Sequence, residues 1–495
     1  MSLDPRTPVL VGYGQVNQPD SVAEPQEPVA LMAEAARSAV DARVLAAVDA
    51  IRVVNLLSWR YRDPGLLLGE LIGAKNPATR YTGVGGNVPQ SLVNQACADI
   101  TAGSAEVVLI AGAETWRSRK RLKAAGVRPD WTKQDDTVPV PPGAEDAVEM
   151  SSPAQDRIGL ALPSHVYPWF EEALRVAAGE SQDEHRRKIG ALWARFNEVA
   201  QHNPHAWSNK AWTAEQIAEP GPDNRMISWP YTKLLNSNNM VDQGAVLILT
   251  SVEKATALQI PRERWVFPWA GTDSHDTYSI AERLDYHRSP AIRIGAARAL
   301  ELAGLGIDDI DLIDIYSCFP SAVQVAAAEI GVAIDDPARP LTVTGGLTFA
   351  GGPWNNYVSH SIATMAEKLV AAPGTRGLIT ANGGYLTKHA FGVYSTEPPA
   401  GGFRWEDVQA AVDAEPTRRS LVDWTGVGTL ETWTVPFGRD GAPENAFLAV
   451  RTPDDARVLA LVADRDGAAS LVDGKGADPA GAKVQVHADG KASLL

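Results

Sequence analysis

The sequence predicts a layered α/β fold that contains an internal duplication and ends in a small all-β domain. Strand-like and helix-like segments alternate over most of the 495 residues, which is typical of helices packed on sheets. Residues 94–114 and 360–384 share one order, namely a helix, a glycine-containing stop, a buried strand and a terminus of small residues. After Pro398 and Pro399, short strands separated by DG and KG turns replace this alternation.

The first half is predicted from apolar runs and helical spacing. Met32, Ala36 and Val40 recur at intervals of four, so they lie on one face of a helix. The run EVVLIAGA is apolar throughout, which is typical of a strand buried on both faces. The predicted order is a strand at 8–16, a helix at 29–40, a strand at 51–57, a helix at 66–72, a strand at 80–84, a helix at 89–102 and a strand at 106–113.

The second half follows the same order after a long interruption. Residues 117–240 contain basic, Pro-rich and Trp-rich stretches and one clear helix at 184–201, and this region is too long for a connection inside a compact domain. The later elements are strands at 243–251, 310–316 and 376–380 and helices at 291–303, 319–330 and 355–370. We therefore predict an N-terminal half at 1–116 and 241–262, an inserted region at 117–240, a C-terminal half at 263–400 and a β domain at 401–495.

The composition of the chain disfavours several classes of function. The formal net charge of −15 disfavours binding to nucleic acid and to anionic membranes. The two cysteines, Cys97 and Cys318, are far apart, which excludes a disulfide framework and a zinc ribbon, and we predict no metal site. No apolar run approaches a membrane span, and the N-terminus lacks an apolar region of secretory length, so we expect a cytoplasmic protein.

Four motifs at the ends of predicted elements carry the candidate chemistry. They are YTGVGGNVPQ before a helix, IYSCFPSAV after a strand, GGLTFAGGPWNN before a helix, and LITANGGYLTKH at the end of a strand. In this order and on these elements they resemble the motifs of the thiolase superfamily, nearest the thiolases linked to sterol carrier protein and the acetyl-CoA acetyltransferases. The resemblance covers residues 8–400 and implies a duplicated thiolase fold with a layered α-β-α-β-α core.

The same resemblance places unreactive residues where thiolases carry reactive side chains. The nucleophilic cysteine corresponds to Gly86, and the histidine that activates it corresponds to Gly352. The second cysteine, an acid and base, corresponds to Thr380 or Asn382, depending on how the glycines are aligned. Claisen chemistry needs a thiolate and a base, so ordinary thiolysis and condensation are not expected.

Three titratable residues remain as candidate catalytic groups. Tyr316 stands where the related thiolases have a histidine, and it either donates a hydrogen bond to a thioester or packs on a neighbour. Lys388 and His389 follow the last glycines and are either an acid–base pair or a solvated loop. Cys97 falls eleven positions into the predicted helix, where its apolar neighbours indicate a buried structural thiol and not a nucleophile.

Backbone groups and one loop are the candidate ligand contacts. The glycine motif before the helix at 89–102 can direct N–H groups and the helix dipole at a thioester carbonyl. The later glycines either allow close approach of backbone to ligand or only form tight turns. In the inserted region, the resemblance implies aromatic and cationic contacts with CoA, although the same residues also suit ordinary loop packing. The candidate contacts are Gly85, Asn87, Arg225, Tyr231, Lys233, Gly351, Gly383 and Gly384.

The sequence thus predicts a thiolase-fold protein whose ligand is CoA or an acyl-CoA and which holds no tightly bound cofactor. Two alternatives stay open: an acyltransferase that uses Tyr316, Lys388 or His389 in unusual roles, and a non-catalytic partner of an active thiolase. Family members are commonly dimers, so the resemblance implies a homodimer. Residues 401–495 resemble the OB-like accessory domain of some thiolase-fold proteins, and their 15 acidic against 10 basic residues disfavour nucleic-acid binding.

Overall fold

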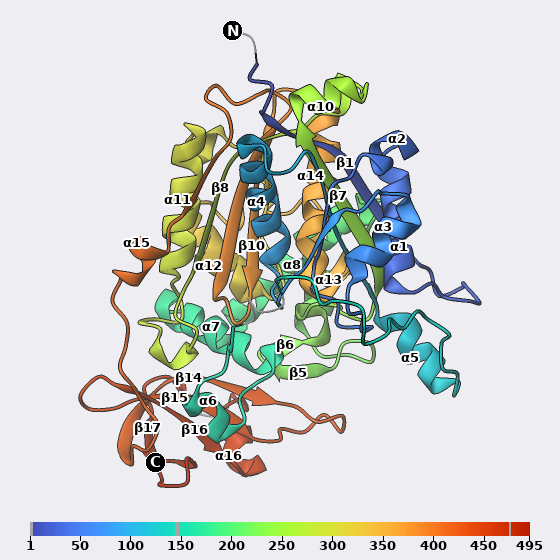
Figure 1. Ribbon diagram of the computed structural model, residues 1–495. Helices are drawn as coiled ribbons and strands as arrows, with labels where there is room; N and C mark the ends of the chain where they lie inside the picture. Colours follow the sequence, from blue (N-terminus) through green and yellow to red (C-terminus); the bar gives the residue numbers. More distant parts are fainter. Residues whose placement is uncertain (1–2, 144–147, 475–476) are drawn as a thin grey trace.

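Two five-stranded sheets form the centre of the computed structural model, which describes residues 3–143, 148–474 and 477–495 (Figure 1). The first sheet has the order β1 (Pro8–Asn17), β7 (Asp242–Ser251), β4 (Val107–Thr115), β2 (Ala50–Val53) and β3 (Ala78–Tyr81). Strand β7 pairs antiparallel with both of its neighbours, whereas β2 pairs parallel with both of its own. The first half of the chain therefore builds a mixed sheet.

The second sheet repeats this pattern. Its order is β12 (Arg404–Asp407), β8 (Phe267–His275), β11 (Lys388–Ser395), β10 (Arg376–Gly383) and β9 (Leu312–Asp314). Strand β11 pairs antiparallel with both neighbours, as β7 does in the first sheet. Strand β10 pairs parallel with β9, as β4 pairs with β2 in the first sheet. The predicted duplication is confirmed. The edge strand β12 comes from the segment that leads to the C-terminal domain and pairs parallel with β8.

Helices form three layers around and between the two sheets. Helices α4 (Val88–Ala102) and α14 (Tyr357–Ala371) lie between them, because α4 packs on β7 and β11, and α14 packs on β1 and β10. Helices α1 (Pro28–Ala39) and α3 (Pro64–Ile72) cover the outer face of the first sheet, and α11 (Pro290–Ala303) and α12 (Pro320–Ile330) lie on the side of the second (Figure 1). The predicted α-β-α-β-α core is confirmed. Shorter helices are α2 (Ala42–Ala46), α10 (Val252–Ala257) and α13 (Gly346–Phe349).

Three strands are shorter than the sequence predicts. The predictions at 51–57, 80–84 and 310–316 correspond to β2, β3 and β9, which end at Val53, Tyr81 and Asp314. In each case the chain leaves the sheet early. The residues after β3 and β9 form the loops that carry the first and second motifs. The apolar pattern continues past the ends of these strands because parts of these loops are buried outside the sheet.

The described part of the inserted region forms helices and strands, and one of its strands pairs with a strand of the C-terminal domain. The predicted helix at 184–201 is α8, which begins with a capping box between Ser181 and Glu184. Strand β5 (Met226–Trp229) pairs antiparallel with β14 (Gly426–Pro436) of the C-terminal domain, and β6 (Tyr231–Thr232) pairs with β5. The elements of this region are α5 (Trp116–Ala124), α6 (Pro153–Ile158), α7 (Pro163–Ala178), α8 (Gln182–His202), α9 (Ala214–Ala218), β5 (Met226–Trp229) and β6 (Tyr231–Thr232).

Strands dominate the C-terminal domain, as predicted. The sheet curves so that a bridge between Leu461 and Lys491 brings its last residues back to β16. Its apolar face forms a core of its own. The strands are β13 (Ser420–Leu421), β14 (Gly426–Pro436), β15 (Ala446–Arg451), β16 (Arg457–Val462), β17 (Lys483–Val486) and β18 (Ala492–Leu494), with short helices α15 (Gln409–Asp413) and α16 (Arg465–Ser470).

A buried arginine joins this domain to the thiolase-like core. Arg457 is fully buried, and its guanidinium forms two hydrogen bonds with the Glu431 carboxylate, at 2.7 and 2.8 Å. It also donates to the backbone carbonyls of Ala281 (3.1 Å) and Leu284 (3.2 Å), and it lies 4.3 Å from the centroid of the Tyr286 ring. Arg457 donates hydrogen bonds to carbonyl oxygens of the core, and its charge is balanced by Glu431 of the C-terminal domain. This side chain therefore links the domain to the core.

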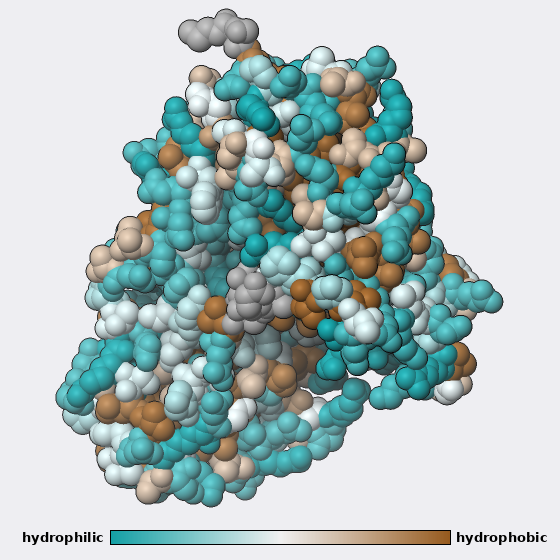
Figure 2. Space-filling model, viewed as in Figure 1, coloured by the Kyte–Doolittle hydropathy of each residue, from teal (hydrophilic) through white to brown (hydrophobic). Residues whose placement is uncertain are grey.

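Within the described ranges, no helix is long and apolar enough to cross a membrane. Over the same residues, no group of three or more ligating side chains could hold a metal ion. Figure 2 shows a mainly hydrophilic face on which apolar residues lie in small separate groups.

Candidate functional site

The four motif segments meet at the N-terminus of α4. Gly85 donates its backbone N–H to Asn355 Oδ1 at 3.0 Å, which joins the first motif to the third. A Cβ placed on Gly383, in the fourth motif, would lie 3.1 Å from the Gly86 nitrogen. The Tyr316 hydroxyl, from the second motif, lies directly beside Gly86. The fold therefore brings together residues that are far apart in the sequence.

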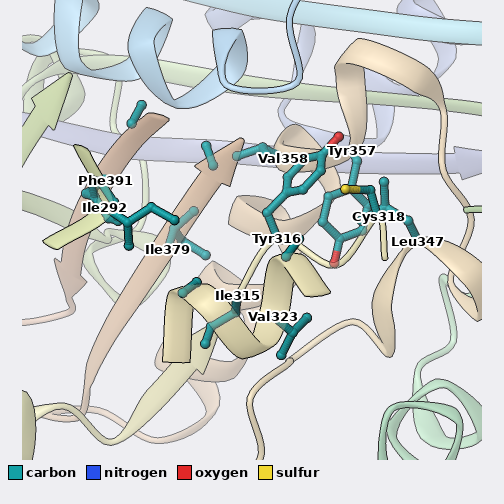
Figure 3. Close-up of a cluster of buried hydrophobic side chains, with 14 of the residues drawn as sticks. Ile292, Ile315, Tyr316, Cys318, Val323, Leu347, Tyr357, Val358, Ile379 and Phe391 are labelled. Carbon is teal, nitrogen blue, oxygen red and sulfur yellow. The ribbon is translucent and has the colours of Figure 1, made fainter. Parts of the chain in front are cut away.

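Tyr316 occupies the space that a side chain at position 86 would need. A Cβ on Gly86 would overlap the Tyr316 hydroxyl and the Asn382 carbonyl oxygen. The buried Tyr316 ring packs edge-on against Tyr357, with centroids 5.5 Å apart, and its backbone N–H donates to Thr380 Oγ1 at 3.0 Å (Figure 3). Burial raises the pKa of this phenol well above its usual value, so it stays protonated at neutral pH. A packed aromatic ring thus fills the space beside Gly86.

Gly352, which the sequence analysis assigns to the activating histidine, has more open surroundings than Gly86. A Cβ on Gly352 would lie 2.9 Å from Asn239 Oδ1 and 3.3 Å from Ser237 Oγ, both of which are ends of side chains. The preceding Gly351 has a φ of 106°, a conformation that glycine adopts readily. His360 does not replace the missing base, because it lies within α14 and burial lowers its pKa to about 3.

Thr380 and Asn382 are not titratable, and both have structural partners. Thr380 accepts the hydrogen bond from Tyr316 described above. Asn382 Nδ2 donates to the Tyr167 hydroxyl at 2.9 Å, and that hydroxyl donates to the Gly384 carbonyl at 3.1 Å. These bonds tie the end of β10 to helix α7 of the inserted region.

The two cysteines are not nucleophiles in this environment. Cys97 is fully buried in α4, as the sequence predicts, and burial raises the pKa of its thiol. Burial also raises the pKa of the Cys318 thiol to about 12, although its contacts with Tyr167 and Asn382 oppose the shift. The thiolate is the reactive form, so both side chains are inert near neutral pH.

A cleft of about 410 Å³ opens beside the N-terminal turns of α4. Lys388 lines it, and its Nζ donates to the Val84 carbonyl at 2.5 Å. Burial lowers the pKa of Lys388. The other lining residues are Arg80, Thr82, Gly83, Val84, Asn87, Val88, Ser91, Leu92, Gln95, Val148, Asp273, Ser274, His275, Tyr278, His389, Trp405, Asp407 and Gln409. We refer to this space as the α4 cleft.

His389 is a buried, neutral side chain. Its Nε2 lies 3.2 Å from the Leu386 carbonyl oxygen and 3.8 Å from Asp276 Oδ2. Burial lowers its pKa to about 4, even though the charge of Asp276 acts in the opposite direction. The expectation that Lys388 and His389 form a solvated loop is wrong for His389, because β11 places this residue inside the core.

Three residues of the inserted region do not join the site. The prediction that Tyr231 contacts a ligand is wrong, because Tyr231 is fully buried and its hydroxyl donates to Glu171 Oε2 at 2.5 Å. Arg225 and Lys233 are exposed, and neither lines the α4 cleft. Arg225 donates to the Met226 carbonyl at 3.0 Å. Arg225 and Lys233 flank a Trp-Pro-Tyr run, a pattern that is typical of a binding loop, but the aromatic residues of that run are buried.

Sequence reasoning missed one wall of the cleft. Half-buried Asp273 accepts hydrogen bonds from Ser91, from Asn94 Nδ2 at 2.9 Å and from Trp405 Nε1 at 2.7 Å. Trp405 belongs to β12, which reaches the cleft only because the segment after residue 400 adds a strand to the second sheet. No motif signals this wall, since its residues come from three separate parts of the chain.

Fold and site together define a thiolase-fold protein in which Tyr316 fills the space beside Gly86. The dimeric peroxisomal thiolase of Saccharomyces cerevisiae shares this fold, with a TM-score of 0.56 and 14% identity over 80% of this chain and 99% of that one. A monomeric SCP2-thiolase like protein type 1 from Mycobacterium smegmatis is 32% identical over the full length of both chains, with a TM-score of 0.83. Residues 407–491 match the family model for the thiolase-like protein type 1 additional C-terminal domain. This chain belongs to the SCP2-thiolase-like protein type 1 family.

Curated relatives connect the core to acetyl-CoA acetyltransferases. One of these, from Methanothermobacter thermautotrophicus, is 25% identical over 268 residues, which is 51% of this chain and 64% of the relative. Across three such relatives, the matched segments span 34% to 64% of the relatives' own length. The chain is therefore related to these enzymes through part of the thiolase-like core.

Proposed function

We propose that this protein binds a coenzyme A thioester in the α4 cleft and does not become acylated. One observation carries the proposal: a cleft with a cationic residue, Lys388, lies beside the N-terminus of α4, while the neighbouring nucleophile position is filled by Tyr316. Relationship to acetyl-CoA acetyltransferases supports a CoA thioester as the ligand. The ligand would approach the helix but would meet no thiolate there.

Lys388 suits an anionic or carbonyl oxygen in the cleft. A lysine ammonium has three N–H donors, and one of them is used by the Val84 carbonyl. The other two can face a ligand. Since the whole chain has a net charge of −15, attraction of a CoA phosphate depends on local cations such as this one.

The backbone at the start of α4 adds a donor at the same end of the cleft. The N–H group of Asn87, which lines the cleft, has no hydrogen-bond acceptor among the residues that the structure describes, whereas Gly86 is buried and does not line the cleft. Such a group, together with the helix dipole, favours a carbonyl or phosphate oxygen. This donor supports the proposed position of the thioester near Asn87 and Lys388.

The arrangement does not favour an acyltransferase that uses Tyr316, Lys388 or His389. Nucleophilic catalysis needs a nucleophile within hydrogen-bond reach of a base. The Tyr316 phenol has a raised pKa and the His389 imidazole is buried, and no hydrogen bond joins them in the described part of the chain. A homodimer and a partner thiolase subunit remain predictions; a partner would be detected by co-purification of the full chain from its source cells.

The variant Lys388→Met should bind CoA and acetyl-CoA roughly tenfold or more weakly than the parent, because it removes a charge-assisted hydrogen bond while keeping the length of the side chain. Isothermal titration calorimetry at neutral pH and low salt measures the change. The matched control is Lys368→Met on the exposed side of α14, away from the cleft. Equal affinity in Lys388→Met and the parent, or no heat from the parent at millimolar CoA, would contradict the proposal.

A further inference from the structure

A buried histidine lies between two carboxylates at the junction of α7 and α8, outside the α4 cleft. His185 Nε2 lies 2.5 Å from Glu171 Oε1, and His185 Nδ1 lies 2.6 Å from Glu180 Oε2. Glu171 belongs to α7, Glu180 to the turn between the two helices, and His185 to the first turn of α8. We refer to these three residues as the His185 bridge. None of them lines the α4 cleft, so the proposed function does not use them.

The acceptors around the imidazole ring determine its protonation state. Glu171 is fully buried and also accepts hydrogen bonds from the Tyr231 hydroxyl, at 2.5 Å, and from Gln324 Nε2. Glu180 accepts a further hydrogen bond from Lys188 Nζ at 2.8 Å on its second oxygen. A neutral imidazole has one N–H and one lone pair, so one ring nitrogen would face a carboxylate oxygen with no proton between them. An imidazolium, in contrast, donates to both carboxylates.

The charges of the bridge balance only when the histidine is protonated. Its two carboxylates then face two cations, the imidazolium and the Lys188 ammonium. The neighbouring charges form a group of their own, in which Arg175 pairs with Glu172 at 2.8 Å and with Asp478 at 2.6 Å. Loss of the proton would therefore leave the fully buried carboxylate of Glu171 without a cationic partner, which is strongly unfavourable.

Hydrogen bonds continue from the bridge toward the motif segments. Ser321, in the first turn of α12, donates its backbone N–H to the Tyr231 hydroxyl at 3.2 Å and its own hydroxyl to the Tyr167 carbonyl at 3.1 Å. Tyr167 lies one turn before Glu171 on α7, and its hydroxyl accepts the hydrogen bond from Asn382 at the end of β10. The bridge thus joins α8 to the helix that contacts the fourth motif.

We propose that the His185 bridge is a pH-sensitive contact, which holds α8 against α7 while the imidazole is protonated and releases the first turns of α8 when the proton is lost to solvent. Burial lowers the pKa of His185, but the hydrogen bonds and charges of Glu171 and Glu180 outweigh burial, so this pKa lies above its usual value. A group whose pKa is raised by folding stabilises the fold fully below its unfolded pKa, which is ~6.5 for histidine. The stabilisation is lost as the pH rises through the folded-state pKa, so the contact opens on the alkaline side of ~6.5.

Nitrogen NMR of the full chain with isotope-labelled histidine tests the protonation directly. At about one pH unit above the ordinary histidine pKa, one imidazole should still carry protons on both ring nitrogens, and its signal should vanish in His185→Gln. In Glu180→Gln, which removes one carboxylate at a partly exposed position, the titration midpoint of this imidazole should fall by roughly one pH unit. The matched control Glu198→Gln, at an exposed position later in α8, should leave the midpoint unchanged. A parent chain in which every imidazole is neutral at this pH would overturn the proposal.

Hydrogen exchange followed by mass spectrometry tests the release of α8. The protection of residues 182–192, corrected for the intrinsic exchange rate, should fall about tenfold or more as the pH rises through this midpoint, because each unit of pKa shift is a factor of ten in the opening equilibrium. Helix α1, on the outer face of the first sheet, is the internal control and should keep its protection. His185→Gln should show equal protection of residues 182–192 on both sides of the midpoint. Unchanged protection in a parent chain whose imidazole has lost its proton would show that the bridge does not hold α8. A bridge that stays protonated until the whole chain unfolds would likewise contradict the proposal.

Discussion

The variant Gly86→Ala should lower the free energy of unfolding by about 3 kcal/mol, at the upper end of the usual cost of overpacking. The added methyl group would overlap the Tyr316 hydroxyl and the Asn382 carbonyl oxygen and would lie 2.9 Å from Tyr316 Cζ. One of these atoms belongs to the backbone and the others to a buried ring, so neither neighbour moves easily. Urea unfolding of the parent and the variant measures the difference.

Two other glycines serve as controls for this prediction. Gly221→Ala meets no atom within 4 Å and should unfold at the midpoint of the parent. Gly352→Ala, on the opposite side of the site, meets first the end of the Asn239 side chain at 2.9 Å and should cost less than Gly86→Ala. In a Tyr316→Ala background the cost of Gly86→Ala should fall by roughly 1 kcal/mol or more, since the two residues compete for one space. An unchanged cost in that background would show that Tyr316 does not fill the position.

This packing determines whether substitutions at Gly86 and Gly352 could create a reactive site. If Gly86 only marked a missing cysteine, Gly86→Cys with Gly352→His would restore a site that accepts an acetyl group. Position 352 has room near flexible side chains, but position 86 does not have room for a Cβ while Tyr316 is present. Restoration by these two substitutions is therefore not expected.

The variant Arg457→Met should lower the free energy of unfolding by roughly 3 kcal/mol, because the nearly buried Glu431 carboxylate loses its two short hydrogen bonds and keeps only the ion pair with Arg451 at 3.5 Å. The guanidinium forms two hydrogen bonds with Glu431, whose side chain is 15% exposed, and it satisfies carbonyls of the core segment that contains Ala281 and Leu284. The loss should appear first as separation of the C-terminal domain. Limited proteolysis between residues 401 and 425 and differential scanning calorimetry report it.

An exposed arginine in the same domain is the matched control. Arg465 pairs with Asp440 at 3.2 Å on the surface, and Arg465→Met should unfold at the midpoint of the parent. The double variant Arg457→Met/Glu431→Met should recover part of the stability, because it removes both charges together. A single Arg457→Met variant as stable as the parent would mean that this buried pair does not hold the domain.

The sequence predicted the architecture because hydrophobic periodicity is a local property. Helices α4 and α14 and the strands that follow them came from runs whose apolar residues are buried, although α4 also buries Gln90 and Asn94, and α14 also buries His360. The assignment of Gly86 and Gly352 to the positions of reactive side chains rests on the spacing within the motifs and stays a prediction. These predictions used only residues that lie close together in the sequence.

The remaining features depend on contacts between distant segments. The sequence around Tyr231 suggests an aromatic residue in a loop, yet a buried carboxylate on α7, that of Glu171, accepts a hydrogen bond from its hydroxyl inside the protein. Trp405 lies 132 residues from Asp273, and only the pairing of β12 with β8 brings them together. That Tyr316 fills the space beside Gly86 likewise follows from the meeting of two motifs in the fold, and no spacing within either motif reveals it.

Equilibrium dialysis against acetyl-CoA labelled in the acetyl group, followed by denaturation of the protein, tests non-covalent binding most directly. The account predicts that label accumulates with the native protein and that all of it is released on denaturation, because no thiolate or other activated nucleophile lies beside the thioester. Label that stays on the denatured chain would contradict the account by revealing an acyl-enzyme. Label that never exceeds the concentration outside the dialysis membrane would contradict it by revealing no binding at all.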